Sequence, residues 1–406
     1  MYTRRDLLKL AVLLPTGAWL SRYQAMADPE RGRIRITEIR AMKLTNSNCL
    51  IRVDTDAGIS GYGEAGTNGP MARARIEVMK QHLIGKDPLA IEVHFHNLTT
   101  IMHAWMAHIP TISGIDIALW DLAGKILNRP LCVLLGGPFR ESIPLYSHGF
   151  NLDMLDKGSC HDWAQRVRST PEGFTAYKIS FDSYIGIPSA RYATTLTPAQ
   201  IRTIVQAYSN LREAVGNDID IAIHCHNELD TPSAIGVAKA VEPLEPLFYE
   251  DPLNVPFSEA WIALKRASRI PILTGEKIEM LRGFKPFIDN QAIDIIHPDL
   301  AFAGGITGAR KIADYAALTR TPVALHNVGS LVLTMASAHF GASVQNFYRS
   351  ESPLGWPARI AEKMAASNPP SVKSSQLQVP MSPGLGFDIN PDFLKEYLEP
   401  GEPFWG

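Results

Sequence analysis

The stretch from residue 221 to residue 352 decides the fold. It contains six short apolar segments that each end in a polar residue: IAIHCHNE (221–228), LFYEDP (247–252), ILTGEK (272–277), IIHPDL (295–300), VALHN (323–327) and FYRSES (347–352). The polar residues, separated by 26, 26, 23, 27 and 25 positions, are His224, Glu250, Glu276, Asp299, His326 and Glu351. A strand that recurs at this spacing, followed each time by a helix, is typical of a (β/α)8 barrel. Because the carboxyl ends of barrel strands meet at one mouth, we expect these side chains to converge there.

Two further strands are expected before this stretch, in IPLYSHGF (143–150) and FTAYKISF (174–181), and Lys178 ends the second. Lys178 and His224 are 46 residues apart, which is about twenty more than one strand–helix unit needs. The surplus, residues 182–197, is rich in Ser, Thr, Gly and Tyr, and we interpret it as an insertion over the mouth. Helical patterns follow the later strands, at 232–241, 257–268, 280–290, 308–318 and 331–344.

The residues before the barrel have a different pattern. Strand, turn and strand are expected between residues 34 and 64, and helical patterns cover about 72–106 and then 113–126. This order does not continue the strand–helix repeat, so we assign residues 34–142 to a separate α+β domain. The barrel with its metal site is assigned to residues 143–360, and residues 361–406 form a C-terminal segment.

Residues 1–27 are excluded from the fold. TRRDLLK (3–9) is a twin-arginine pattern, an apolar run follows, and AMA (25–27) is a small-x-small cleavage site. The run is too short to span a membrane, so we predict a signal peptide, export to the periplasm by the twin-arginine route and no stable membrane anchor after cleavage. With a net charge of −2 over 406 residues, the chain lacks the excess of positive charge that indicates nucleic-acid binding.

Glu250 and Glu276 end neighbouring barrel strands, where two carboxylates would repel each other unless a cation lay between them. Oxygen ligands of this kind suit Mg²⁺ or Mn²⁺, whereas His224 on the preceding strand suits Zn²⁺, Fe²⁺ or Mn²⁺. His226 lies two residues after His224 and faces the same way. The alternative for the carboxylates is solvated strand-end charge, and for each histidine a hydrogen-bonded core group.

Asp299 and His326 end consecutive strands, and a carboxylate beside an imidazole makes a candidate general acid or base. Glu351, if protonated, could donate a hydrogen bond to a developing oxyanion. Lys178 is a candidate base or electrostatic stabiliser, with a surface lysine as an equal alternative. Solvated strand-end polarity is the alternative for Asp299, His326 and Glu351.

Several segments, in this order, resemble motifs of the enolase superfamily, in its mandelate racemase/muconate lactonizing enzyme group. They are SGIDIALWDLAGK (113–125), FYEDPL (248–253), LTGEK (273–277), HPDLAFAGGITGARKIA (297–313), ALHNVGS (324–330) and PGLGFD (383–388). The resemblance implies an N-terminal capping domain completed by the C-terminal tail. It also implies a barrel that binds a divalent metal, usually Mg²⁺, and removes a proton next to a carboxylate.

Carried onto this sequence, the resemblance makes Glu250 and Glu276 the second and third metal ligands, and Asp299 with His326 the catalytic dyad. Glu351 matches the acid that contacts the substrate carboxylate. His226 matches the histidine of sugar-acid dehydratases such as galactonate and mannonate dehydratase, and Lys178 matches the first lysine of the racemase K-x-K element.

Two positions depart from the family pattern. His224 stands where the first metal ligand is normally Asp, and Ser180 stands where the second lysine would be. The first departure points to a softer metal or to metal binding that is weakened or lost, and the second argues against a racemase with paired lysines.

Three hypotheses follow for the function. The first is a metal-dependent lyase that dehydrates a sugar acid, a small carboxylate substrate. The second is a racemase, epimerase or cycloisomerase, and the third is a non-catalytic protein that binds a carboxylate. Members of the family often form symmetric oligomers, so a homo-oligomer is expected.

Overall fold

The computed structural model describes residues 32–45, 49–101, 107–149, 152–184, 194–226, 229–353 and 363–405. The expected signal peptide (1–27) and most of the expected insertion over the mouth lie outside these ranges. Among the described residues, no helix combines the length and apolar character that crossing a membrane requires.

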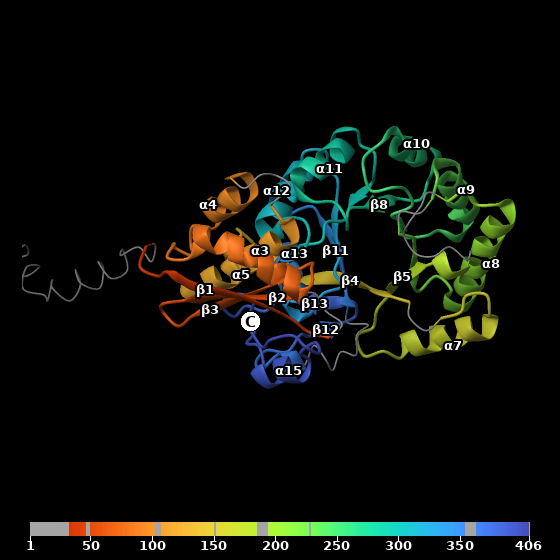
Figure 1. Ribbon diagram of the computed structural model, residues 1–406. Helices are drawn as coiled ribbons and strands as arrows, with labels where there is room; N and C mark the ends of the chain where they lie inside the picture. The colour runs from red at the N-terminus through yellow and green to blue at the C-terminus, as the bar shows by residue number, and fades with distance from the viewer. Residues whose placement is uncertain are drawn as a thin grey trace, which may run out of the picture.

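The N-terminal domain is a three-stranded antiparallel sheet of β1 (Ile36–Lys43), β2 (Cys49–Thr55) and β3 (Ser60–Ala65), covered by helices (Figure 1). The helices are α3 (Gly69–Leu83), α4 (Ile91–His96), α5 (Ile109–Ile126) and α6 (Leu131–Leu134), with a π-helical turn at Asn97–Ile101. The single helical pattern expected over 72–106 is wrong, because α3 ends at Leu83 and the chain turns through Gly85 at φ 75°.

Helix α5 packs directly onto the sheet because β3 carries two glycines where the backbones meet. A Cβ atom on Gly61 would lie 2.1 Å from the carbonyl oxygen of Ala118, and one on Gly63 would lie 2.0 Å from that of Gly114. No side chain fits at either position. Helix α5 is almost wholly buried by the elements around it, in agreement with its apolar sequence.

The second domain is the barrel predicted from the sequence. Eight parallel strands follow one another in chain order and β11 pairs with β4 to close the ring. The strands are β4 (Ser142–His148), β5 (Ala176–Ser180), β6 (Asp220–His224), β7 (Tyr249–Glu250), β8 (Ile272–Thr274), β9 (Ile295–Ile296), β10 (Val323–Leu325) and β11 (Phe347–Glu351). Figure 1 shows the barrel beside the N-terminal domain.

An outer layer of helices surrounds the barrel strands. These helices are α7 (Lys157–Arg168), α8 (Pro198–Val215), α9 (Thr231–Val241), α10 (Glu259–Ala267), α11 (Met280–Asp289), α12 (Gly305–Ala317) and α13 (Leu331–Ser343). Short 3₁₀ turns lie at Asp182–Tyr184 and Glu242–Leu244. The last five helices begin and end within three residues of the predicted ranges, because each range followed an apolar repeat that packs on the barrel.

The centre of the barrel is filled by one inward side chain from most strands. These form a separate apolar cluster of Tyr146, Ala176, Ala222, Phe248, Leu273, Ile295 and Ala324. Successive inward side chains on a strand are two residues apart. The inward positions directly above six members of this cluster are therefore His148, Lys178, His224, Glu250, His297 and His326.

The C-terminal segment joins both domains. It contains β12 (Val372–Lys373), β13 (Gln376–Gln378) and α15 (Pro391–Glu396), and β13 pairs antiparallel with the first barrel strand, β4. Beyond β13, the Leu385 amide donates to Asp121 of α5 (2.8 Å), and Glu402 forms an ion pair with Arg73 of α3 (2.5 Å). The N-terminal domain is thus completed by the chain's last residues, as the resemblance implied.

The two domains also meet where α5 reaches the start of α12. Asp116 of α5 accepts a hydrogen bond from the Thr307 amide (2.9 Å), and Ser113 accepts one from the Gly304 amide (3.0 Å). The first amides of a helix have no partner within the helix, so side chains of the N-terminal domain cap this barrel helix. Burial raises the pKa of Asp116 from 3.8 to about 7, although its hydrogen bonds to Thr307 lower it.

Candidate active site

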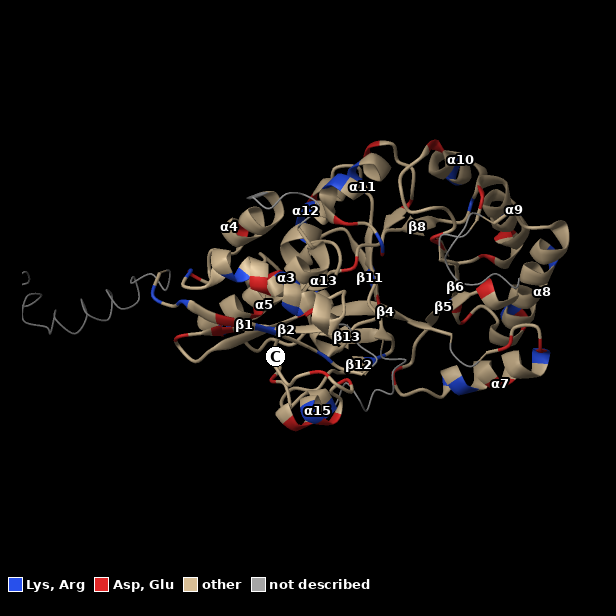
Figure 2. Cartoon of the chain, viewed as in Figure 1, with Lys and Arg blue, Asp and Glu red and all other residues tan. Residues whose placement is uncertain are grey.

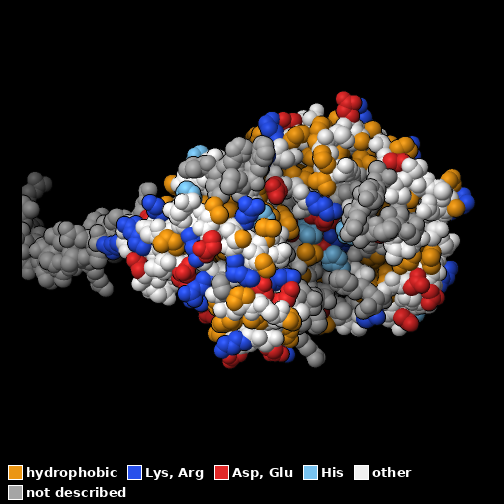
Figure 3. All heavy atoms as spheres, viewed as in Figure 1, with side chains coloured by type: hydrophobic (Ala, Val, Ile, Leu, Met, Phe, Trp, Pro, Cys, Tyr) orange, Lys and Arg blue, Asp and Glu red, His pale blue; other side chains and the backbone are white. Residues whose placement is uncertain are grey.

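The predicted polar residues converge at the mouth of the barrel. Figure 3 shows histidine, acidic and basic side chains gathered in the middle of the barrel face, and Figure 2 shows charged positions around the barrel opening. His224, Glu250 and Glu276 lie on or just after three neighbouring strands, β6, β7 and β8. Each offers a ligand atom, and these three atoms all lie within 4.8 Å of one another.

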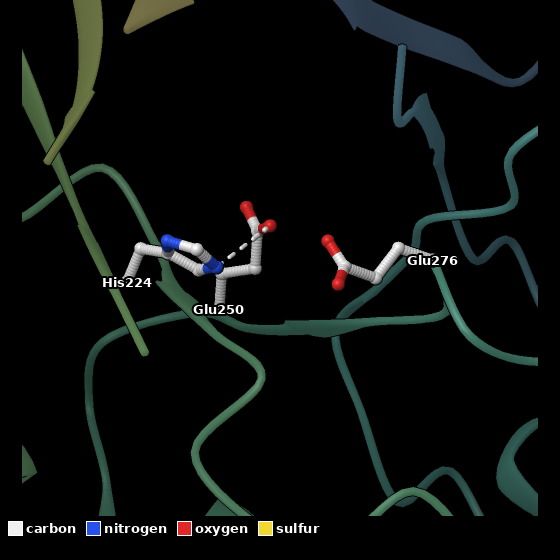
Figure 4. A group of neighbouring side chains, drawn as sticks. All are labelled: His224, Glu250 and Glu276. Atoms are coloured by element: carbon white, nitrogen blue, oxygen red, sulfur yellow. Dashed lines mark ion pairs between the residues drawn. The ribbon is translucent and has the colours of Figure 1, made fainter. Parts of the chain in front are cut away.

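The three side chains point toward one another in Figure 4. Within the described part of the chain, two of their atoms, His224 Nε2 and Glu250 Oε2, are buried without a hydrogen-bond partner. The distance from His224 Nε2 to Glu250 Oε1, 3.6 Å, is too long for a hydrogen bond between them. Buried polar atoms without partners are costly in a folded protein. One imidazole nitrogen and one carboxylate oxygen without partners, converging with the Glu276 carboxylate, fit a divalent cation.

Burial strongly affects the pKa values of this group. Burial, reinforced by Lys178 and His226, lowers the pKa of His224 well below its usual value, so its imidazole is neutral and able to bind a metal. Burial and the nearby carboxylates raise the pKa of Glu250 to about 8, against the opposing effect of Lys178. Burial also acts to raise the pKa of Glu276, but His326, Lys178 and Lys277 lower it to about 2.

Asp299 and His326 form the expected pair. His326 Nδ1 lies 2.6 Å from Asp299 Oδ2, so the carboxylate fixes which ring nitrogen points into the site. The other ring nitrogen, Nε2, lies 3.2 Å from Glu276 and 3.6 Å from Glu351. Although burial lowers the pKa of His326, the Glu351, Glu276 and Asp299 carboxylates raise it to about 10.

Lys178 and Glu351 lie together beside these residues. Lys178 Nζ is 2.7 Å from Glu250 Oε1 and 2.8 Å from Glu351 Oε1, and the lysine side chain is only 2% exposed. Burial lowers the pKa of Lys178, but the Glu250, Glu351 and Glu276 carboxylates have a larger opposite effect and raise that pKa above its usual value. Lys178 is therefore a buried ammonium. This favours electrostatic stabilisation over the role of a base, and the alternative of a surface lysine is wrong.

Glu351 does not have the protonated form that donation to an oxyanion would require. Burial raises its pKa, but Lys178, His148 and His326 hold that pKa well below the usual range. The Asn327 amide donates to its Oε2 (3.3 Å), and His148 contacts its Oε1. Glu351 is therefore a carboxylate that accepts hydrogen bonds, because the cations around it outweigh its burial.

His226 lies across the mouth from His326, since β6 and β10 are four strands apart in the eight-stranded ring. Its ring centroid is 4.1 Å from that of His224, and the two rings meet edge to face. His226 Nδ1 lies 2.7 Å from Asp182 Oδ2, at the start of the expected insertion. The site thus contains two imidazoles, each with its Nδ1 against a carboxylate.

Sequence reasoning missed four residues of this site: Tyr146, His148, Asp182 and His297. Tyr146 Oη lies 2.8 Å from His297 Nε2 and 3.4 Å from Glu351 Oε2, beneath the dyad. His148 and His297 occupy inward positions at the ends of their strands, so the same strand-end rule could have found them. Asp182 gave no signal, because it lies in the short 3₁₀ turn after β5 and not at an inward strand position.

Comparisons with known proteins agree with this architecture. Residues 162–393 match the enolase C-terminal domain-like family, and residues 34–136 match the mandelate racemase/muconate lactonizing enzyme N-terminal domain. A solved structure of a mandelate racemase/muconate lactonizing enzyme-like protein from Rubrobacter xylanophilus superposes with a TM-score of 0.82 at 29% identity, covering 92% of this chain and 99% of that one.

Two characterised relatives are similar over most of their length. D-xylonate dehydratase from Haloferax volcanii is 33% identical over 385 residues, which cover 92% of each chain. D-gluconate dehydratase from Thermoproteus tenax is 28% identical over 414 residues, which cover 98% of this chain and 80% of the relative.

The capped barrel with acid–base residues at its mouth defines an enzyme of the enolase superfamily. Within it, the chain belongs to the mandelate racemase/muconate lactonizing enzyme family. Members of this family use a divalent metal, usually Mg²⁺, and the three converging ligands provide a place for one.

Proposed function

We propose that the protein dehydrates a sugar acid by removing the proton α to its carboxylate and then expelling the β-hydroxyl as water. The observation that carries this proposal is the pair of carboxylate-backed imidazoles, His326 with Asp299 and His226 with Asp182, on opposite sides of the mouth. Dehydration needs a base at one carbon and an acid at the next, and this arrangement supplies both. The names of the two relatives, dehydratases of D-xylonate and D-gluconate, support the same reaction class.

The chain's own residues have separate roles in this reaction. His326 accepts the α-proton in its neutral form, which a divalent cation bound at Glu276 would favour by offsetting the carboxylate charge that raises the His326 pKa. Asp299 stabilises the imidazolium that results. His226 donates a proton to the leaving hydroxyl, so that the C–O bond breaks and water departs, leaving an enol that becomes the 2-oxo acid. The buried ammonium of Lys178 lowers the energy of negative charge in the site.

The cofactor in this proposal is a divalent metal held by His224, Glu250 and Glu276. When bound, it would stabilise the negative charge that develops on the substrate carboxylate. The two carboxylates suit the Mg²⁺ that is usual in the family, and the imidazole nitrogen of His224 makes the set suitable for Mn²⁺, Fe²⁺ or Zn²⁺ as well. Metal analysis of the purified protein identifies the ion.

The test separates the two histidines. The protein is incubated in D₂O with five- and six-carbon aldonic acids, and both 2-oxo acid formation and deuterium uptake at the α-carbon are measured. We expect His326→Asn to lose both reactions. His226→Asn should lose dehydration by about 10²-fold or more but keep α-proton exchange, because only the leaving group lacks its acid.

His161→Asn serves as the matched control, since His161 is an exposed histidine on α7. Full dehydration by both site variants would contradict the proposal. Deuterium uptake by the wild-type protein without loss of water would identify an isomerase instead. A protein that binds aldonic acids but performs neither reaction would be a binding protein.

A further inference from the structure

Glu64 is a buried carboxylate of the N-terminal domain that contacts the amino end of barrel helix α13. It lies near the end of β3, is fully buried, and accepts hydrogen bonds from barrel helix α13 and its N-cap residue. The Ser330 amide donates to its Oε1 (2.9 Å) and Oε2 (3.0 Å), the Ser330 hydroxyl donates to Oε2 (2.5 Å), and the Leu333 amide donates to Oε2 (3.2 Å).

These contacts satisfy the amino end of α13 from outside the barrel. The first amides of a helix lack partners within the helix, and the helix dipole places partial positive charge there. A carboxylate at this point is stabilising on both counts. Ser330 is itself the N-cap residue, and its hydroxyl accepts from the Val332 amide. Glu64 therefore fixes the position of the residue at which α13 begins.

The segment that Glu64 fixes connects His326 to α13 in four residues, 327–330. The Gly329 amide donates to the Asn327 side chain (3.1 Å), and the Asn327 side chain donates to Thr334 (3.1 Å). A Cβ atom on Gly329 would lie 2.7 Å from Glu64 Oε1. Glu64 thus packs closely against this connection, and a side chain at residue 329 would displace either Glu64 or the backbone of the connection.

The same end of β3 contacts the connection that follows Asp299. The Gly66 amide donates to the Ala301 carbonyl (3.3 Å), and the Ala301 amide donates to Asp299 Oδ1 (2.7 Å). A Cβ atom on Gly66 would lie 2.3 Å from the Phe302 ring, so this approach is also close. Two residues of the N-terminal domain, Glu64 and Gly66, therefore contact the chain beyond both members of the dyad.

We propose that Glu64 is a positioning residue for His326: by anchoring Ser330 it sets the direction of the imidazole toward the substrate carbon. The inference rests on the proposed role of His326 as the base. In this role Glu64 makes no contact with substrate. The dyad is aligned only when the N-terminal domain is docked on the barrel. A base that is misplaced by about 1 Å can lose about 10²-fold in rate.

The experiment compares Glu64→Gln and Glu64→Asp with the wild-type protein. The first readout is the proton NMR signal of His326 Nδ1–H in the metal-free protein, identified by its loss in His326→Asn. Because that proton lies in the 2.6 Å contact with Asp299, its frequency reports the alignment of the dyad without substrate or turnover. The second readout is kcat and KM for the aldonic acid that is turned over.

We expect Glu64→Gln to shift or broaden the Nδ1–H signal and to lower kcat by about 10- to 100-fold with little change in KM. Glu64→Asp keeps the negative charge and should give an intermediate result, and it serves as the test if the Gln variant does not fold. Asp121→Asn is the control, since Asp121 is a buried carboxylate of α5 that accepts from the Tyr62 and Leu385 amides, away from the dyad.

A folded Glu64→Gln protein with the wild-type signal and kcat would overturn the inference. So would an Asp121→Asn protein that shows the same shift at equal loss of stability, because the effect would then be general destabilisation. A shifted signal in a protein that dehydrates no aldonic acid would support the positioning of His326 while rejecting the proposed reaction.

Discussion

The two halves of the mouth are built differently. On the side of β6 to β8, buried ligand atoms of His224 and Glu250 have no hydrogen-bond partner among the described residues. On the side of β9 to β11, His326 is held by Asp299, and the chain beyond it is held by Glu64. Protein contacts alone preorganise the His326–Asp299 dyad, although His297 Nδ1 nearby has no hydrogen-bond partner among the described residues, whereas the ligand atoms of the first half are completed only by something that binds. The unsatisfied atoms of His224 and Glu250 thus indicate where a ligand belongs, and the satisfied dyad indicates where the geometry is set in advance.

The largest effect should come from Glu250→Gln, on the incomplete half. Saturating metal should stabilise the wild-type protein, by about 2.7 kcal/mol in unfolding free energy at a metal concentration of 100 Kd. We expect Glu250→Gln to abolish this stabilisation and to lower turnover by about 10³-fold, since a central ligand is lost. Thermal unfolding with and without EDTA measures the first effect.

Two variants calibrate that result. Glu213→Gln, on the exposed face of α8, should behave as wild type. His326→Asn should keep most of the metal-dependent stabilisation, because it alters the half that needs no metal. Equal loss in both site variants would show that the two halves are not independent.

A smaller effect is expected from Asp116, which holds the preorganised half by capping α12. Its pKa is raised from 3.8 to about 7, so between these values the folded state binds a proton that the unfolded chain releases. This contribution to stability is present at low pH and is lost as pH rises through about 7. We expect Asp116→Asn to remove it, reducing the fall in unfolding free energy from pH 5 to pH 8 by a few kcal/mol at most.

Urea unfolding of both proteins across this pH range measures the difference. Asp162→Asn, an exposed position on α7, is the control for adding an amide. Parallel curves of unfolding free energy against pH for wild type and Asp116→Asn would contradict this prediction. They would mean that burial does not raise the pKa of Asp116.

The smallest effect tests the one ligand that departs from the family. His224→Asp exchanges a nitrogen donor for oxygen, so affinity for Mg²⁺ should rise relative to Zn²⁺ by about tenfold, or about 1.4 kcal/mol. Competition titrations of the two metals measure the ratio. His226→Asn, which changes the adjacent imidazole, should leave the ratio alone; an unchanged ratio in His224→Asp would remove His224 from the ligand set.

The barrel and its converging side chains could be predicted because strand ends repeat along the chain. The same rule, applied to inward positions, would also have found His148 and His297. Protonation states could not be predicted: Glu351 is ionised and Lys178 charged because of neighbours that come together only in the fold. Asp182 and Glu64 were likewise beyond reach, since the contact between Glu64 and Ser330 spans 266 residues and depends on how the domains dock.

Strand β4 has a consequence for how the protein is made. It pairs with β13 and β11, and contacts such as Ser142 with Gln376 and Tyr146 with Glu351 span 234 and 205 residues. During synthesis, β5 follows β4 closely and can pair with it early, but β11 and β13 are made much later, so the parts of β4 that they cover are open until then. Contacts this distant in sequence form slowly, and open strand edges promote aggregation. The nascent chain therefore has an interval in which a chaperone has a strand to shield, and the interval lasts until β13 (Gln376–Gln378) has been made.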